Sequence, residues 1–448
     1  MRLSARTSII ALAIVAIGLG GQAYGFHDGG VADCAGCHSM HSSVSTIASA
    51  GGGDYGYLLT ATDQSSTCLN CHEVAGLTSP SSYHMSTAAS DLVNDTDVVA
   101  QRTPGGDFGW LRQDLSAPAS YGGGYVIISN DGYTRGHNII AAGNGYVVDT
   151  DNATAPGGTM PSGNLGCQSC HDPHGSARID STGTVVFPTI GTTFPPIVDS
   201  GSYGSVPAAG EAVGIYRLLG AAGYQATGVP VAFTGAPSAV SPSGYNRDEV
   251  GTPTRVAYGY GTTGGIGSWA DWCGTCHAGM HTDTPGSPSG YVHPVEETLG
   301  GESVNYNAYV KTGDLTGGTG TTSFTSLVPF SSPTADIATL AALANNDGSD
   351  LTGPAGTDRL NCLTCHRAHA SGWEYGLRWN TEAEFLTLGA PAAAIYPGVE
   401  LAGTIGNQGQ FNRGYTTAQM EAAYQGRPAT QEFAGHQRSL CNKCHLKD

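Results

Sequence analysis

Residues 34–38 read Cys-Ala-Gly-Cys-His, and this Cys-x-x-Cys-His pattern recurs with first cysteines at Cys68, Cys167, Cys273, Cys362 and Cys441. All 12 cysteines of the 448-residue chain belong to these motifs. Two thiols at this spacing can add to the two vinyl groups of one porphyrin, and the histidine that follows is then held against the iron. Neither disulfides nor zinc sites require a histidine after every cysteine pair. The pattern therefore predicts six covalent c-type haems.

The motifs name the expected attachment residues directly. The haem-bonding cysteines are Cys34, Cys37, Cys68, Cys71, Cys167, Cys170, Cys273, Cys276, Cys362, Cys365, Cys441 and Cys444. The proximal iron ligands are His38, His72, His171, His277, His366 and His445.

Histidines outside the motifs are numerous enough to supply every distal iron position. Six distal ligands are needed, and eight candidates are available: His27, His41, His84, His137, His174, His281, His293 and His369. A ninth, His436, lies in a polar stretch and suits a surface or propionate contact better. Methionine is the less well supplied alternative, and any one candidate can instead bind a propionate or the backbone. We expect low-spin, six-coordinate, bis-histidine irons.

The spacing of four candidates favours a neighbouring haem. His41, His174 and His369 each follow a motif histidine by three residues, and His281 follows one by four. On a helical turn these residues share a face with the proximal histidine. They then cannot reach the far side of the same haem, and the iron of an adjacent haem is the expected partner.

Composition predicts a fold built around the cofactors. The chain contains 67 glycines and few long apolar runs, so its aliphatic residues alone make no large core. We predict a mostly irregular chain with short helices and few short strands, wrapped around a haem chain. Helical turns are expected at each motif and at 335–345 and 417–424, and strands at 124–128 and 145–148. The acidic loops 94–97 and 345–350 lack a full calcium ligand set and are expected to be solvated.

The first 25 residues are typical of an export signal, with two arginines followed by an apolar run too short to span a bilayer. We predict cleavage before Phe26, a single haem-binding domain over 26–448, and secretion after periplasmic haem attachment. No other stretch predicts a transmembrane span. The 36 acidic and 18 basic residues give a net charge of −18, which argues against nucleic acid or anionic membrane as partners.

The chain resembles the filament-forming hexahaem cytochromes found on the outer surface of metal-reducing bacteria. The resemblance runs almost from end to end of residues 26–448. It is carried by FHDGGVADCAGCHSMH from Phe26, SSTCLNCH ending at His72, SPSSYH ending at His84, TPGGDFGW from Thr103, GHN at His137, CQSCHDPHG from Cys167, TRVAYG from Thr254, WCGTCH from Trp272, TGDLTGG from Thr312, NCLTCHRAHASG from Asn361 and the C-terminal CNKCHLKD. One departure is Glu73-Val74-Ala75, where a relative has an additional histidine.

The resemblance implies a continuous row of six bis-histidine haems in each subunit. It also implies a head-to-tail homopolymer in which His41 binds the iron held by His366 of the adjacent subunit. Extracellular metal oxides and other cytochromes are the implied electron acceptors, as in dissimilatory metal reduction.

The sequence allows three functions. An extracellular electron conduit, not an enzyme, agrees with full bis-histidine ligation, which leaves no open iron for a substrate. A monomeric periplasmic or outer-surface electron shuttle has the same chemistry without the polymer. A multihaem reductase of small oxyanions needs one open haem, and no motif differs from the others in a way that marks one.

Overall fold

The computed structural model describes residues 34–38, 59–80, 83–121, 124–174, 178–182, 184–186, 197–200, 206–214, 237–240, 256–260, 268–281, 295–308, 328–344, 353–380, 385–387, 396, 415–426, 441 and 444. The predicted export signal, the loop 345–350 and five histidines lie outside these residues: His27, His41, His293, His436 and His445.

The helices are short, as the composition predicts. The α-helices are α2 (Cys34–Cys37), α3 (Gln64–His72), α4 (Trp269–Gly274), α5 (Ala278–His281), α6 (Glu302–Ala308), α7 (Ile337–Leu343), α8 (Cys362–Cys365) and α9 (Thr417–Ala423). The 3-10 turns are η2 (Ala89–Asp91), η3 (Phe108–Arg112), η4 (Gly132–Arg135), η5 (Ala142–Asn144), η6 (Ser162–Asn164), η7 (Cys167–Ser169) and η9 (Glu374–Gly376). In the described part of the chain, no helix is both long enough and apolar enough to span a bilayer.

Side-chain caps define where several helices begin. The Asp63 carboxylate accepts a hydrogen bond from the Ser66 amide at 2.7 Å and starts α3. Asn361 accepts from the Thr364 amide at 3.1 Å and starts α8, and Asp336 accepts from the Thr339 amide at 2.8 Å and starts α7. Such caps satisfy amides that have no partner within the helix. The helices predicted at 335–345 and 417–424 are confirmed as α7 and α9.

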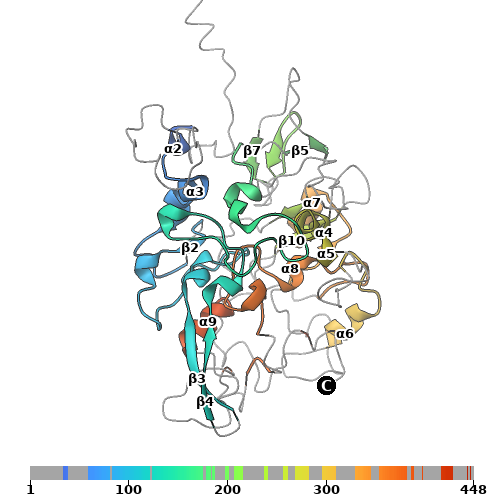
Figure 1. The fold of residues 1–448 in the computed structure, drawn as a ribbon. Coiled ribbons are helices and arrows are strands. Elements are labelled where there is room, and N and C mark those ends of the chain that lie inside the picture. The colour runs from blue at the N-terminus through green and yellow to red at the C-terminus, as the bar shows by residue number, and fades with distance from the viewer. Residues whose placement is uncertain are drawn as a thin grey trace, which may run out of the picture.

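The strands are β1 (Glu73–Val74), β2 (Ser86–Thr87), β3 (Leu115–Tyr121), β4 (Gly124–Asn130), β5 (Arg178–Asp180), β6 (Val185–Val186), β7 (Ile197–Ser200), β8 (Ala212–Gly214), β9 (Ala239–Val240), β10 (Ala257–Gly259) and β11 (Ser331–Ser332). They form small separate sheets: β1-β2, the β3-β4 hairpin, β11-β10-β9 and β6-β5-β8-β7. In Figure 1 the hairpin extends down the lower left of the molecule, and α4, α5 and α7 lie together to the right of the centre, beside β10 and α8.

One predicted strand is confirmed and another is wrong. The strand expected at 124–128 is β4, paired antiparallel with β3. Residues 145–148 form no strand, because Gly145 takes a left-handed backbone (φ 81°) and closes a tight loop in which Tyr146 bridges back to Ala141. Tyr146 is buried, but Val147 and Val148 are exposed. Backbone geometry at the glycine therefore overrides the apolar pattern.

The apolar core is divided into several clusters. The largest contains many aromatic residues: Trp110, Trp373, Trp379, Tyr396, Tyr415 and Tyr424 are among its members. The ring centroids of Trp373 and Tyr424 lie 5.0 Å apart. Smaller clusters lie beneath β9, β10 and α7, and beside α3. This division into pieces agrees with the predicted fold, in which the protein supplies only part of the interior.

Candidate haem-binding sites

Cysteines of different motifs lie beside one another. The Cys68 thiol hydrogen-bonds to Cys167, and this contact is the main reason why the pKa of Cys68 is raised. The Cys273 thiol likewise hydrogen-bonds to Cys362, which together with burial raises its pKa. In a haem-loaded chain these sulfurs would be thioethers. The second motif therefore lies next to the third, and the fourth next to the fifth.

Electrostatic contacts join the remaining neighbours. Burial and the nearby Cys276 raise the pKa of Cys170 to about 12, which places the third motif beside the fourth. Burial and the nearby Cys441 raise the pKa of Cys365 to about 12, which places the fifth motif beside the sixth. From the second motif to the sixth, the attachment points follow each other in space in the order of the sequence.

The first motif is tied to the second through the chain between them. The Thr60 amide donates to the Cys37 carbonyl at 3.0 Å, and the Thr60 hydroxyl donates to the Gly36 carbonyl at 3.3 Å. Residues 61–63 then lead directly into α3, which carries the second motif. In Figure 1, α2 and α3 lie next to each other.

Three pairs of imidazole rings combine a motif histidine with a candidate distal histidine. The ring centroids of His38 and His174 are 6.4 Å apart. Those of His171 and His369 are 6.2 Å apart. Those of His137 and His277 are 5.9 Å apart.

These separations fit one iron between each pair. A metal–imidazole nitrogen bond of about 2 Å puts the centroids of two imidazoles on opposite sides of one metal about 6 Å apart. The planes of the rings differ by 10° for His38 and His174, 62° for His171 and His369, and 44° for His137 and His277. Among the described residues, no cluster of three or more metal-binding side chains suggests a different kind of metal site.

Burial keeps two of these histidines neutral, the form that binds a metal. Desolvation, with a smaller contribution from His277, lowers the pKa of His137 to about 4. Desolvation, with a smaller contribution from His171, lowers the pKa of His369 to about 3. The donor set therefore fits haem iron on chemical grounds as well as by spacing.

Backbone carbonyls orient four imidazoles. The Nδ1 atom of His72 lies 2.8 Å from the Tyr83 carbonyl oxygen, and that of His366 lies 2.8 Å from the Tyr375 carbonyl oxygen. Two further bonds fix the rings of the third pair: His137 Nδ1 to the Ala368 oxygen at 2.7 Å, and His277 Nδ1 to the Pro156 oxygen at 2.9 Å. A bond from Nδ1 to a carbonyl leaves Nε2 as the nitrogen available to a metal.

The predicted geometry after the motif histidines is partly wrong. Helix α8 ends at Cys365, and His366 is extended (φ −108°, ψ 155°), so His366 and His369 do not share a helical turn. His366 bridges to Leu377, and the His369 amide donates to the Gly105 carbonyl at 2.8 Å. Pairing with these distant segments overrides continuation of the helix. His174 also lies in a turn, whereas His281 ends the short helix α5.

His84 is 5 % exposed, and desolvation lowers its pKa, which also favours a neutral ring. The loop 94–97, considered for calcium, folds on itself, because the Asp97 carboxylate accepts from the Asn94 amide at 2.7 Å.

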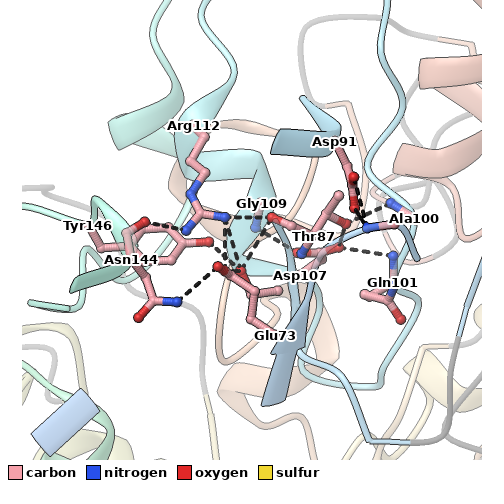
Figure 2. Close-up of polar contacts among 12 residues, drawn as sticks. Glu73, Thr87, Asp91, Ala100, Gln101, Asp107, Gly109, Arg112, Asn144 and Tyr146 are labelled. Carbon is pink, nitrogen blue, oxygen red and sulfur yellow. Dashed lines mark hydrogen bonds and ion pairs between the residues drawn. The ribbon is translucent and has the colours of Figure 1, made fainter. Parts of the chain in front are cut away.

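A buried polar network follows the second motif directly (Figure 2). Glu73 pairs with Arg112 at 2.9 Å, and both side chains are 9 % exposed. The Arg112 guanidinium lies 3.9 Å from the centre of the Tyr146 ring and donates to the Asn144 carbonyl at 2.5 Å. Because Glu73 follows His72 in the chain, this ion pair anchors the second motif to η3 and to the loop after η5.

Asp107 forms the other half of this network. It is fully buried and accepts hydrogen bonds from the Thr87 hydroxyl at 2.5 Å and from the amides of Thr87, Gln101 and Gly109 at 2.8, 2.9 and 2.6 Å. The next residue, Phe108, stacks on His369 with centroids 4.7 Å apart. Asp107 thereby holds in place the aromatic ring that contacts a candidate iron ligand.

Sequence reasoning missed these supporting residues. Residues Thr103–Trp110 stood out only as part of the resemblance, with no role assigned. The consecutive glycines Gly105 and Gly106 carry the local signal: Gly106 has φ 93°, and a Cβ there would lie 1.8 Å from the Ala370 carbonyl oxygen. Only glycine permits this close approach of two backbones beside His369. The carbonyl acceptors have no sequence signal at all.

Comparison with known proteins identifies the family. No family model matches the chain. It is 43 % identical over 442 residues to the C-type cytochrome OmcS of Geobacter sulfurreducens, covering 95 % of each chain. Its fold matches the solved outer membrane cytochrome S filament from that organism with a TM-score of 0.76, 42 % identity, and coverage of 94 % of this chain and 100 % of the other. A cryo-EM structure of OmcS nanowires gives a TM-score of 0.76 at 41 % identity, with the same coverage. The predicted resemblance is confirmed: the chain belongs to the OmcS family of c-type cytochromes.

Proposed function

We propose that this chain is the subunit of an extracellular filament that conducts electrons through six covalent c-type haems. The observation that carries the proposal is the set of three facing imidazole pairs, each of which joins one motif to a distant segment. The successive contacts between motifs support a continuous row of cofactors, and the relatives solved as filaments support polymerisation. Haem, when bound, supplies one-electron chemistry, and the protein sets its spacing and ligation.

Each of the three facing imidazole pairs supplies the two axial ligands of one iron. The motif histidines His38, His171 and His277 hold irons whose distal ligands are His174, His369 and His137 in turn. His41 binds the iron held by His366 of the adjacent subunit. The distal ligands for His72 and His445 come from the four remaining candidates: His27, His84, His281 and His293.

Complete ligation accounts for electron transfer without substrate turnover. If imidazole occupies both axial positions of every haem, no iron coordination site is open to a small oxyanion, which argues against reductase chemistry. The acceptors we propose are extracellular metal oxides and other cytochromes. Cleavage before Phe26, a single domain over 26–448 and haem attachment in the periplasm belong to the same proposal.

Replacing His41 with Ala tests the filament. The variant should carry six haems by intact mass, but one haem should become high-spin and filaments should shorten or disappear in electron micrographs. His436→Ala is the matched control, because it removes a histidine that is not among the proposed iron ligands, and it should assemble normally. Normal filaments with six low-spin haems in His41→Ala would refute the shared ligand, and a chain with fewer than six haems would refute the row itself.

A further inference from the structure

The segment after the fifth motif folds back along it. His366 and Leu377 form an antiparallel bridge, and between them Tyr375 has a left-handed backbone (φ 60°) where the chain reverses. The Arg378 amide then donates to the Cys365 carbonyl at 2.8 Å. The reversal therefore brings Arg378 to the second cysteine of the motif.

The Arg378 side chain adds a second contact with the motif. Its Nε atom donates to the Leu363 carbonyl at 2.7 Å, and Leu363 lies between the two attachment cysteines, Cys362 and Cys365. Arg378 is only 5 % exposed. The guanidinium is therefore held inside the protein, against the loop whose two ends would carry the bonds to haem.

This guanidinium carries a fixed positive charge. Arginine stays protonated in proteins, and salt screens a buried charge much less than an exposed one. Burial raises the pKa of the Cys365 thiol to about 12, and the charge of Arg378 acts on this thiol in the opposite direction. The field of Arg378 therefore reaches an atom to which haem would be bonded.

The second motif has a charge of the opposite sign. Its helix α3 begins at the Asp63 carboxylate, which accepts from the Ser66 amide at 2.7 Å. A hydrogen bond to Cys167 and burial raise the pKa of Cys68, and the charge of Asp63 acts in the same direction. At the fifth motif the residue that caps the helix is Asn361, which is neutral.

A haem iron carries one more positive charge in the ferric state than in the ferrous state. A nearby cation therefore disfavours the ferric state and raises the reduction potential, and a nearby anion lowers it, with an energy that grows as the local dielectric constant falls. We infer that Arg378 raises the reduction potential of the haem at the fifth motif and that Asp63 lowers that of the haem at the second. This inference rests on the haem attachment proposed above.

Arg378→Gln and Arg378→Lys separate the charge from the hydrogen bond at the fifth motif. Both side chains can still donate to the Leu363 carbonyl, but only lysine keeps the charge. In spectroelectrochemical titrations of the chain loaded with six haems, Arg378→Gln should shift one component of the wild-type curve to lower potential. Arg378→Lys should retain the wild-type curve in mildly acidic buffer, which keeps a buried lysine charged. Equal curves in the two variants, both shifted or both unshifted, would overturn the inference.

Asp63→Asn is the counterpart with the opposite sign. Asparagine is also a good helix cap, so α3 should keep its start while the negative charge is lost. One component of the curve should move to higher potential. An unchanged curve, or a shift to lower potential, would refute the role of Asp63, and this result can be obtained even if Arg378→Gln does not fold.

A chain without the fifth haem shows where Arg378 acts. Replacing both Cys362 and Cys365 with Ala removes this attachment site, so adding Arg378→Gln should leave the titration curve of that chain unchanged. A shift that persists there would place the effect at another haem and overturn the inference. Intact mass separates the two proposals. Fewer than six haems on the wild-type chain would contradict the proposed function, whereas six haems and an unmoved curve would contradict only this inference.

Discussion

The imidazole rings of His38 and His174 face each other with centroids 6.4 Å apart and planes only 10° from parallel. One ring comes from the first Cys-x-x-Cys-His motif and the other from the turn after the third. The contact therefore draws together two segments that the sequence separates by two motifs.

Removing His174 should affect the first haem alone. Parallel imidazole planes separate the energies of the iron orbitals that interact with the rings, so we expect this site to give a rhombic low-spin EPR signal. His174→Ala should abolish that signal and produce a high-spin signal from one haem equivalent. His436→Ala serves as the control and should retain the wild-type spectrum. An unchanged low-spin spectrum in His174→Ala would contradict the pairing.

Gly106→Ala should displace His369. An added Cβ would lie 1.8 Å from the Ala370 carbonyl oxygen, and the backbone has φ 93°. Both problems require the loop beside His369 to move, so we expect partial loss of low-spin haem at the third motif. Gly145→Ala is the control, since Gly145 has φ 81° but open space around it. It should cost only about 1 kcal/mol of stability and leave every haem low-spin. Equal behaviour of the two variants would show that the close approach is unimportant.

Arg112→Met should destabilise the region after the second motif. It leaves Glu73 buried without its charged partner, an expected loss of about 3 kcal/mol in the free energy of unfolding. Arg359→Met is the matched control. Both arginines lie 3.9 Å over a tyrosine ring, but Arg359 is 3.6 Å from Glu296 and its side chain is 30 % exposed. The expected loss in the free energy of unfolding for Arg359→Met is about 1 kcal/mol. Denaturant unfolding followed by circular dichroism measures both, and equal losses would refute the role of burial.

Asp107→Asn should also destabilise the protein. An amide cannot accept all the bonds that the buried carboxylate receives from Thr87, Gln101 and Gly109, so we expect a loss of about 2 kcal/mol. Asp114→Asn is the control, because Asp114 is exposed and accepts one bond, from the Gly132 amide at 2.8 Å. The loss of stability in Asp114→Asn should be much smaller than that in Asp107→Asn.

Asp107→Asn should also change how the stability of the protein depends on pH. Burial raises the pKa of Asp107 above its ordinary value of 3.8. The folded protein then binds a proton at a pH where the unfolded chain has already released it. Stability contributed by this residue should therefore fall as the pH rises from 3.8 through the raised pKa. Asp107→Asn should flatten this slope, measured by denaturant unfolding across the range, and an unchanged slope would show that Asp107 does not titrate there.

The sequence by itself determined the local chemistry. Attachment of haem needs two thiols and one histidine within five consecutive residues, so the motifs can be read without a fold. The same is true of α7, where Asp336 caps a short run of good helix formers, and of the glycine-rich composition that leaves most of the chain irregular. Each of these features depends on residues that lie close together in the sequence.

Only the tertiary structure decided which histidine faces which. The two faces of a site such as that of His277 and His137 come from distant segments, and no periodicity records their meeting. The carbonyl acceptors are harder still to foresee. His137 bonds to Ala368, 231 residues away, and His277 to Pro156, 121 residues away. Because every residue has a carbonyl, the sequence carries no mark of those that fold beside an imidazole.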